Sequence, residues 1–454
     1  MNKEKISQRL KAEMNDLKRT PDSVATELDV PIKEVKSFLD GDFRLSDYLE
    51  FIIKFTKIYP VDISDLLIDI DDTKNGILHF NIKDSMESSR VFSRQDKEGN
   101  FTPYYEYRDT ASSKIAYFYP EWISQLRVVS DDDPYNLDVA YNRGHFLHQY
   151  TLFVGPVNFY YEVDGIKYCK KMNTGDSMYI TPYIKHSFTS RDSSKTAYII
   201  AVTSGGYVKH SLHKFHNFGT NFLTNSKLNI HSFSNRLKKI VEIAANNELR
   251  DINSINLELK NKGIKKTLSD FYENNNINVN DIHILSEVLN IDPSDLLFPE
   301  KYSKEKVSIT KFNPNQYEFY PNKEDPAYRI YRLQKVSNVE GMKGFIINPL
   351  SSKNKIYFEF SLNIYMINYE ESEITVSWIN DSKNYSINLK KGESLYIKPF
   401  IKFSLTSIKK DSMVFVNTIL SGISTTTMKE LSFFEDSQRI ISDNNTWFKN
   451  KKDE

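Results

Sequence analysis

The chain has 454 residues, enough for about two to four domains with separate cores. Lys plus Arg (60) balance Asp plus Glu (60), which excludes a global basic field for nucleic acid or anionic lipid. The single cysteine, Cys169, excludes an internal disulfide framework and is typical of a reducing compartment. The first residues carry no apolar signal region, and no run approaches the ~18 apolar residues of a membrane span. We therefore expect a soluble, cytoplasmic protein.

The first segment of the chain has helical spacing. Apolar residues recur every three to four positions through residues 24–30 and 32–39, and Gly41 is placed to end a helix. The block from Thr20 to Gly41 resembles the helix-turn-helix of phage-repressor-like regulators. We expect a helical module over residues 1–75.

From about Ile77 the apolar period changes towards two, which is typical of strands. Residues 104–110, 151–154, 158–163 and 196–202 are expected strands, separated by turns such as Asp164-Gly165. Helical spacing returns over about 231–300, and strand spacing over about 305–425.

The chain contains an internal repeat. Residues 175–190 and 392–407 share ten of sixteen identical positions, far beyond chance for two stretches of one chain. The Gly…Pro…His arrangement that ends at His186 resembles a cupin motif. We predict an α+β protein, a bi-cupin in which helix-turn-helix-like modules alternate with cupin β-barrels. Its expected units are 1–75 (helical), 76–228 (catalytic barrel), 229–302 (helical), 303–430 (degenerate barrel) and 431–454 (tail).

Two segments offer ligands for a metal ion. Residues 141–155 supply His145, His148 and Gln149 but no carboxylate, and the later motif supplies His186. On a straight strand, His145 and Gln149 share a face but lie about 13 Å apart, too far to bind one ion. The chain must therefore bend here, and Gly144 makes an entry by a loop plausible. His145 is preferred as the first ligand, and His148 stays open as an alternative.

The second copy provides an internal comparison. Counting back from the matched glycines Gly175 and Gly392, His145 aligns with Leu362, Gln149 with Met366 and His186 with Phe403. Each polar candidate is apolar in the second copy. This pattern favours one active barrel and one structural barrel.

Several short motifs carry a resemblance to a known family. They are N142-x-x-H145, the segment from Gly175 to His186, Y104-Y-E-Y107 and M14-N-x-x-K18. Together they resemble the 2-hydroxyethylphosphonate dioxygenase family, a tandem of helix-turn-helix-like and cupin units. The resemblance covers nearly the whole chain.

That family contains two chemistries. One branch makes hydroxymethylphosphonate and formate with a His, Glu, His iron site. The other makes methylphosphonate and carbon dioxide, with two histidines and a glutamine on the iron. Here Ile180 occupies the position of the glutamate, and Gln149 stands four residues after His145, as in the second branch. The resemblance therefore implies the methylphosphonate-forming chemistry, with the dioxygenase as the alternative.

The resemblance also implies roles for individual residues. His145, Gln149 and His186 are implied as Fe(II) ligands, with 2-hydroxyethylphosphonate and O2 as the reactants. Tyr107 and Asn142 match residues that hydrogen-bond the phosphonate. The other implied groups are Lys18, which reaches the active site from the helical module, and Arg94, which holds the phosphonate, with Arg90 as the fallback. The expected assembly is a homo-oligomer.

A transcription regulator is the more distant alternative, because helix-turn-helix plus cupin describes such proteins too. The segment that would read DNA, residues 31–41, carries Glu34 and Asp40 and has no Arg, Asn or Gln to read bases. The balanced charge also argues against a strong phosphate-backbone contribution. We therefore expect no nucleic-acid partner. A bi-cupin that only binds sugar or serves as structure would hold no iron.

Overall fold

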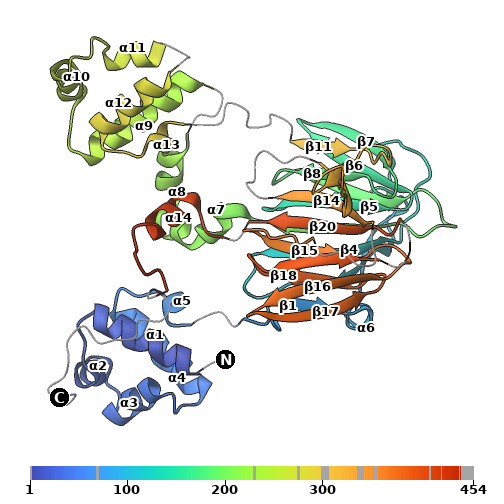
Figure 1. Ribbon diagram of the computed structural model, residues 1–454, viewed down its shortest axis with the longest axis horizontal. Coiled ribbons are helices and arrows are strands. Elements are labelled where there is room, and N and C mark those ends of the chain that lie inside the picture. Colours follow the sequence, from blue (N-terminus) through green and yellow to red (C-terminus); the bar gives the residue numbers. More distant parts are fainter. Residues whose placement is uncertain are drawn as a thin grey trace.

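The computed structural model describes residues 3–67, 71–228, 232–273, 277–297, 306–334, 342–350, 356–407, 409, 411–420, 422–438 and 440. Within these residues, blocks of helices alternate with blocks of strands along the chain (Figure 1). No helix in this part of the chain is long and apolar enough to cross a membrane. The predicted unit boundary at 302/303 and residues 441–454 of the predicted tail lie outside the described residues.

The first helical unit has its own core. Its helices are α1 (Lys3–Asp16), α2 (Pro21–Leu28), α3 (Ile32–Asp40), α4 (Leu45–Ile58) and α5 (Ile63–Leu66). Helix α2 begins at a capping box, in which the Thr20 hydroxyl accepts a hydrogen bond from the Ser23 amide at 3.2 Å. Helix α3 ends at Gly41, whose φ of 79° suits glycine. The helix pair expected from residues 20–41 is present.

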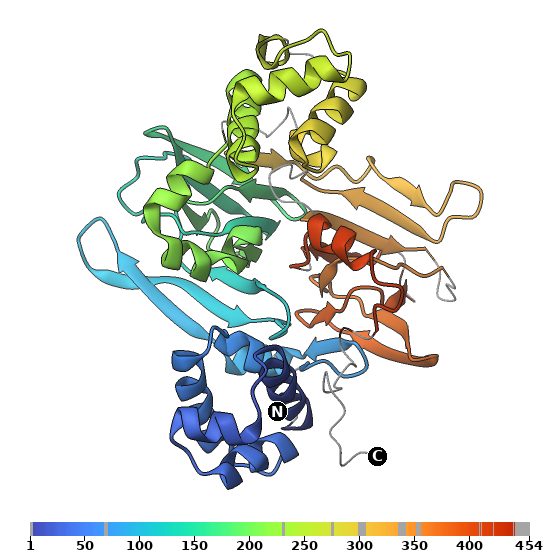
Figure 2. The same ribbon diagram turned by 90° about the vertical axis from the view of Figure 1, so that its left-hand side faces the viewer.

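A second helical unit lies at the opposite end of the molecule, as Figures 1 and 2 show. Its helices are α9 (Phe233–Asn247), α10 (Ile252–Asn261), α11 (Leu268–Glu273), α12 (Val279–Leu289) and α13 (Pro293–Leu296). Between the two units, on the same side of the sheets, lie α7 (Gly206–His210), α8 (Leu212–Ser226) and α14 (Thr425–Leu431). The helices at 206–226 were not anticipated, because the sequence analysis assigned that stretch to a barrel.

The strands form four sheets. The first half of the chain supplies β1 (Ile77–Phe80), β2 (Arg90–Gln95), β3 (Phe101–Asp109), β4 (Phe118–Gln125), β5 (His148–Val154), β6 (Val157–Val163), β7 (Ile166–Met172), β8 (Ser177–Ile180), β9 (Lys185–Ser190) and β10 (Tyr198–Ser204), with the short helix α6 (Ile82–Glu87) after β1. The second half supplies β11 (Val307–Thr310), β12 (Glu318–Tyr320), β13 (Tyr328–Arg332), β14 (Lys343–Pro349), β15 (Asn363–Ile367), β16 (Ile374–Asn380), β17 (Lys383–Leu389), β18 (Ser394–Ile397), β19 (Lys402–Thr406) and β20 (Val414–Ile419). The four strands expected from the period of two correspond to β3, β5, β6 and β10.

The sheets stack in four layers. One seven-stranded sheet has the order β11-β8-β5-β10-β4-β3-β2, and the other has the order β1-β18-β15-β20-β14-β13-β12. These two sheets pack face to face through a shared core that includes Tyr150, Tyr179, Tyr365 and Tyr396. The outer faces carry the three-stranded sheets β7-β6-β9 and β17-β16-β19, each over a further apolar core.

The two halves exchange strands. Strand β1, from the first half of the sequence, pairs with β18 in the second large sheet. Strand β11, which follows the second helical unit, pairs with β8 in the first large sheet, where Val307 lies opposite Ile180. Each large sheet therefore takes an edge strand from the other half of the chain. This exchange was not visible in the sequence.

The fold is a mixture of helices and sheets, as expected. The closed barrels that the sequence analysis also expected are not seen among the described strands. Among the described strands, each pair of sheets stays open and does not close into a barrel by hydrogen bonds. Side chains between the large and small sheets fill the interior instead.

The contact between the two large sheets predicts the effect of one substitution. A Cβ added at Gly344 on β14 would lie 2.3 Å from the Tyr150 hydroxyl on β5. Gly344→Ala should therefore lower the free energy of unfolding by about 1–3 kcal/mol through overpacking, measured by denaturant unfolding. Lys343→Ala, at the exposed neighbouring position, is the control and should change it by less than about 0.5 kcal/mol. Equal stability of Gly344→Ala and the wild type would contradict this packing.

Candidate metal centre

A cavity of about 200 Å³ opens inside the first half, on the face of the large sheet that is turned towards β6 and β9. Its lining is Arg94, Tyr105, Tyr107, Glu121, Ile123, Ala140, Asn142, His145, Leu147, Gln149, His186, Phe188, Ala201 and Thr203. Six of the seven residues predicted for the site lie there, and Lys18 does not.

A bend in the chain brings His145 beside Gln149. Strand β5 starts only at His148, so His145 lies in the preceding loop. Gly144 has a φ of 77°, and a Cβ there would lie 2.6 Å from the Tyr183 carbonyl. The Tyr183 amide in turn donates to the His145 carbonyl at 2.9 Å. The loop therefore sets His145 Nε2 3.2 Å from Gln149 Oε1.

The Gln149 amide has a defined orientation. Its Nε2 donates to the Thr151 hydroxyl at 2.9 Å, two residues further along β5. This hydrogen bond assigns the amide nitrogen to Thr151 and the carbonyl oxygen to the cavity. Gln149 is nearly fully buried, so the oxygen is presented from a fixed position.

His186 is buried on β9 and is held at both ring nitrogens. Its Nδ1 lies 2.8 Å from the Ile184 carbonyl, which assigns the ring proton to Nδ1. Burial lowers the pKa of His186 to about 4, so the ring is neutral at physiological pH. Its Nε2 lies 3.0 Å from the Asn142 amide nitrogen, which faces the cavity.

These donors fit a transition-metal ion. Ligands that bind one ion at 2.0–2.2 Å lie about 3 Å from each other, which matches the Nε2 to Oε1 distance of 3.2 Å at His145 and Gln149. The His145 and His186 rings are 5.2 Å apart between centroids and nearly perpendicular. His145 Nδ1 is buried without a hydrogen-bond partner among the described residues. In the same part of the chain, no group of three or more His, Cys, Asp or Glu residues could hold a metal. The candidate donor beside the two histidines is the Gln149 amide.

His148, the alternative first ligand, points elsewhere. Its Nδ1 lies 2.6 Å from the Tyr179 hydroxyl, and the two rings stack at 5.9 Å. It does not line the cavity. Burial lowers the pKa of His148 to about 4, so it is a neutral group in the sheet interior.

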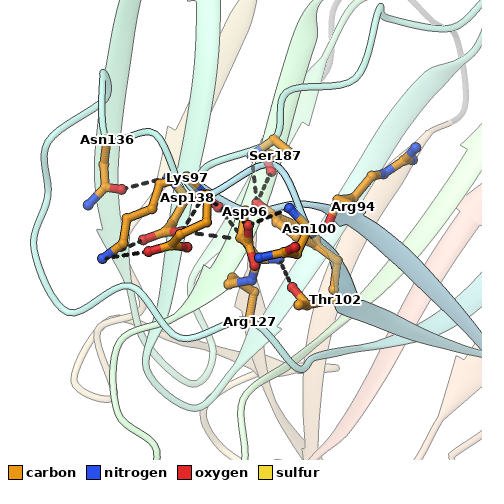
Figure 3. A network of polar contacts seen from close by, with 12 residues as sticks. Arg94, Asp96, Lys97, Asn100, Thr102, Arg127, Asn136, Asp138 and Ser187 are labelled. Atoms are coloured by element: carbon orange, nitrogen blue, oxygen red, sulfur yellow. Dashed lines mark hydrogen bonds and ion pairs between the residues drawn. The ribbon is translucent and has the colours of Figure 1, made fainter.

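Arg94 enters the cavity from the end of β2. Figure 3 shows the network behind it: Arg127 donates to the Arg94 carbonyl at 3.3 Å, to the Asp138 carbonyl at 2.9 Å and to the Thr102 hydroxyl. The Arg94 guanidinium extends away from this network and makes no ion pair with a described residue. By contrast, Arg90 is bound to Asp109 at 2.7 Å and does not line the cavity. The geometry therefore favours Arg94 over Arg90 as an anion ligand.

Tyr107 and Glu121 face the cavity from β3 and β4. Burial raises the pKa of Tyr107 to about 12; Glu121 raises it further and Arg94 opposes the rise. Glu121 was missed in the sequence analysis. Its position on β4 was the available signal: Glu121 and the buried Ile123 are two residues apart, so they share the inward face of the strand.

Lys18 lies apart from the cavity. It follows α1 in the first helical unit, is exposed, and donates from Nζ to the Asp16 carbonyl at 3.0 Å. The structure thus does not bring Lys18 together with the other predicted residues.

Ile180 lies directly opposite Gln149 in the pairing of β5 with β8. It is fully buried in the apolar core of the first half. A side chain at either position enters the same region, since opposite residues of an antiparallel pair lie about 5 Å apart. One strand pair thus presents two positions from which a side chain can enter this region, and in this chain Gln149 is the polar one of the two.

The second half has apolar side chains at the place equivalent to the cavity. The two halves can be aligned by their strand pairing, in which the neighbouring residues Tyr150, Tyr179 and Val202 of the first half match Tyr365, Tyr396 and Asn417 of the second.

This register corrects two of the sequence alignments. Gln149 corresponds to Ile364 rather than Met366, and His145 to Phe360 rather than Leu362, because the spacing differs by two residues between the copies. His186 corresponds to Phe403, as predicted. His186 lies opposite Tyr161 of β6, and Phe403 lies opposite Trp378 at the equivalent position of β16. The Phe360 and Phe403 rings stack at 6.2 Å where the histidine pair stands in the first half.

Comparisons with known proteins identify the family of the chain. No protein-family model matches the chain. It is 34% identical over 442 residues to methylphosphonate synthase of Nitrosopumilus maritimus (strain SCM1), which covers 96% of this chain and 93% of that protein. The structure of Streptomyces albus HEPD with substrate 2-hydroxyethylphosphonate and Fe(II) bound has a TM-score of 0.88 and 28% identity, over 98% of each chain. The fold is also shared with PhpD containing cadmium, at a TM-score of 0.69 and 15% identity over 96% and 99% of the two chains.

The fold and the donor set place this chain in a class of oxidoreductases built from helical units and stacked sheets. Within that class, the chain belongs to the family of methylphosphonate synthases and 2-hydroxyethylphosphonate dioxygenases.

The Thr151 contact yields a prediction about metal affinity. Thr151→Val removes the acceptor that orients the Gln149 amide, so the affinity for Fe(II) should fall about 10- to 100-fold, as for other groups that orient a ligand. Anaerobic competition titration against a coloured chelator measures this. Thr189→Val, at an equally buried threonine on β9, should stay within about twofold of the wild type, and His186→Ala marks the loss of the site. Unchanged affinity in Thr151→Val would show that the amide is not held for a metal.

Proposed function

We propose that this chain converts 2-hydroxyethylphosphonate and O2 into methylphosphonate, carbon dioxide and water, with Fe(II) as cofactor. The support from relatives is the methylphosphonate synthase at 34% identity and the HEPD structure that holds this substrate and Fe(II). The observation that carries the choice of chemistry is the amide oxygen of Gln149, fixed beside His145. The resemblance implies that the family's other branch uses a carboxylate from the position of Ile180 instead.

His145, Gln149 and His186 would hold the iron. The ring of His186 is kept neutral by burial and oriented by the Ile184 carbonyl, both of which suit a nitrogen ligand. When bound, Fe(II) supplies open coordination positions for substrate and O2.

Arg94, Tyr107 and Asn142 would bind the phosphonate. Arg94 brings an unpaired guanidinium into the cavity, and Tyr107 presents a phenol that makes no hydrogen bond within the described residues. Asn142 is fixed by two backbone contacts with His186, each at 3.0 Å, so its amide is pre-oriented. Charge-assisted hydrogen bonds from such donors are the strong ones for an oxyanion.

An amide in place of a carboxylate changes the charge of the site. Two histidines and a glutamine are all neutral, so the metal keeps one more positive charge than with a glutamate ligand. Ile180 opposite Gln149 adds no acid. The anionic substrate therefore becomes the main charge that balances the metal.

The proposal includes the finer architecture. Each large sheet with its small partner would form one half of a bi-cupin, with helical units at 1–75 and 229–302, β units at 76–228 and 303–430, and a tail at 431–454. The repeated pairing in the two halves supports this. We also expect a homo-oligomer, since α8 has no buried residue and exposes Phe218 and Phe222. We expect no nucleic-acid partner.

The product of the reaction tests the proposed chemistry. Substrate deuterated at the hydroxyl-bearing carbon should give methylphosphonate with deuterium in its methyl group. The reason is that the site with a glutamine has one negative charge fewer than a site with a glutamate, and so would retain formate. The retained formate then returns its hydrogen to the other carbon fragment. Phosphorus NMR and mass spectrometry after anaerobic loading with Fe(II) and addition of O2 measure product and label.

Substrate deuterated at the phosphorus-bearing carbon is the control, and it should keep both labels in the methyl group. Hydroxymethylphosphonate as the main product, with formate accumulating, would assign the chain to the dioxygenase chemistry.

Lys18 remains a prediction from the family resemblance, because the structure holds it outside the cavity. If it reaches the phosphonate during turnover, Lys18→Ala loses a charged hydrogen bond, and kcat/KM should fall about 10- to 100-fold. Lys11→Ala, at an exposed position on α1, the helix that precedes Lys18, should have wild-type kinetics. Steady-state O2 consumption measures both variants. Wild-type turnover by Lys18→Ala would assign the helical unit a structural or nucleic-acid-facing role.

A further inference from the structure

Glu121 is a charged group of the cavity to which the proposed function gives no role. It lies on the inward face of β4, with Ala201 of β10 and Asp109 of β3 as its register partners. Its carboxylate lines the same 200 Å³ cavity as His145 and Arg94. It accepts no hydrogen bond from the described residues. It is also no part of a metal-binding group of acids and histidines in that part of the chain.

Charged groups of both signs act on the side chains of the cavity. Tyr107 responds to Arg94 and Glu121 in opposite directions, so the phenol lies within reach of a positive and a negative group. The charged groups that act on the pKa of Glu121 are Arg90 and Asp109, which are already paired with each other at 2.7 Å. Strand β10 presents only Ala201. Among the described residues, no Lys, Arg or His thus forms an ion pair with Glu121.

This arrangement is unfavourable for a fully ionised ligand. An oxyanion held by Arg94 and Tyr107 in so small a cavity also meets the Glu121 carboxylate, and two like charges in contact cost several kcal/mol. One shared proton removes the repulsion and replaces it with a short charge-assisted hydrogen bond. Burial already raises the pKa of Glu121, with Asp109 adding to the rise and Arg90 opposing it, so a proton is readily kept between the two groups.

We propose that Glu121 is a specificity-determining residue that admits oxyanions able to carry a proton, such as phosphonates, and rejects sulfonates of the same shape. A phosphonate retains a titratable proton near neutral pH, and that proton bridges the ligand oxygen and the carboxylate. A sulfonate has no such proton. The proposal rests on the substrate class of the proposed function and concerns binding, so it can be tested without turnover.

The test compares 2-hydroxyethylphosphonate with 2-hydroxyethanesulfonate by anaerobic calorimetry on the Fe(II)-loaded protein. The wild type should bind the phosphonate at least about 100-fold more tightly than the sulfonate. Glu121→Gln keeps the shape of the side chain and removes its charge, so the ratio should fall to within about tenfold, mainly through gained sulfonate affinity. Buffers of different ionisation enthalpy at pH 8 should show uptake of about one proton with the phosphonate in the wild type and markedly less in Glu121→Gln.

Glu106→Gln is the matched control. Glu106 lies on the adjacent strand β3, is half-buried, and is bound to Arg108 at 2.6 Å outside the cavity. It should keep the wild-type ratio and proton uptake.

Equal binding of both ligands by the wild type would overturn the proposal, and so would an unchanged ratio in Glu121→Gln. Selective, proton-linked binding without product formation would leave the role of Glu121 intact and count against the proposed reaction alone.

Discussion

The site depends on one backbone constraint, the left-handed turn at Gly144. A residue with a Cβ at this position would meet the Tyr183 carbonyl at 2.6 Å, so only glycine lets the loop approach the turn between β8 and β9 so closely. The hydrogen bond from the Tyr183 amide to the His145 carbonyl then fixes the loop. Because of this contact, a histidine four residues before Gln149 lies beside it instead of about 13 Å away, as on a straight strand. Two donors from one short segment can thus face one ion.

The rest of the site follows from how that segment meets its neighbours. His186 comes from β9 in the small sheet and Gln149 from β5 in the large one, so the donors join the two layers of the first half. Asn142 ties them further, since its backbone and side chain both bond to His186. In the second half, the stacked pair of Phe360 and Phe403 takes the same place. Buried polar groups are costly unless they are paired, so one half keeps polar groups for binding and the other is packed for stability.

Local patterns predicted much of this, and non-local pairing explains what was missed. The helix pair at 20–41 and the strands follow from spacing and from Gly41, which act within a few residues. The cavity histidines were found because the repeat could be compared with itself. The exchange of β1 and β11 depends on partners more than 100 residues apart, beyond any local signal. The two-residue shift that puts Ile364 opposite Ile397 is set by strand register, and a count from the glycines does not detect it. Glu121 was missed because its strand, residues 118–125, was not predicted. Without a predicted strand, the side chains that point inward from this segment could not be assigned.

The pairing of Gln149 with Ile180 gives a physical reason why the two family chemistries can share one fold. A third donor from either position reaches the same space, since the two residues face each other across β5 and β8. Moving the donor from one strand to the next therefore requires no change of backbone, only a carboxylate at one position or an amide at the other. The change in charge is larger than the change in shape. The charged residues that line the cavity are Arg94 and Glu121. In the proposed site, where the metal ligands are neutral, the bound anion and its proton would therefore determine the electrostatics more than the ligand set does.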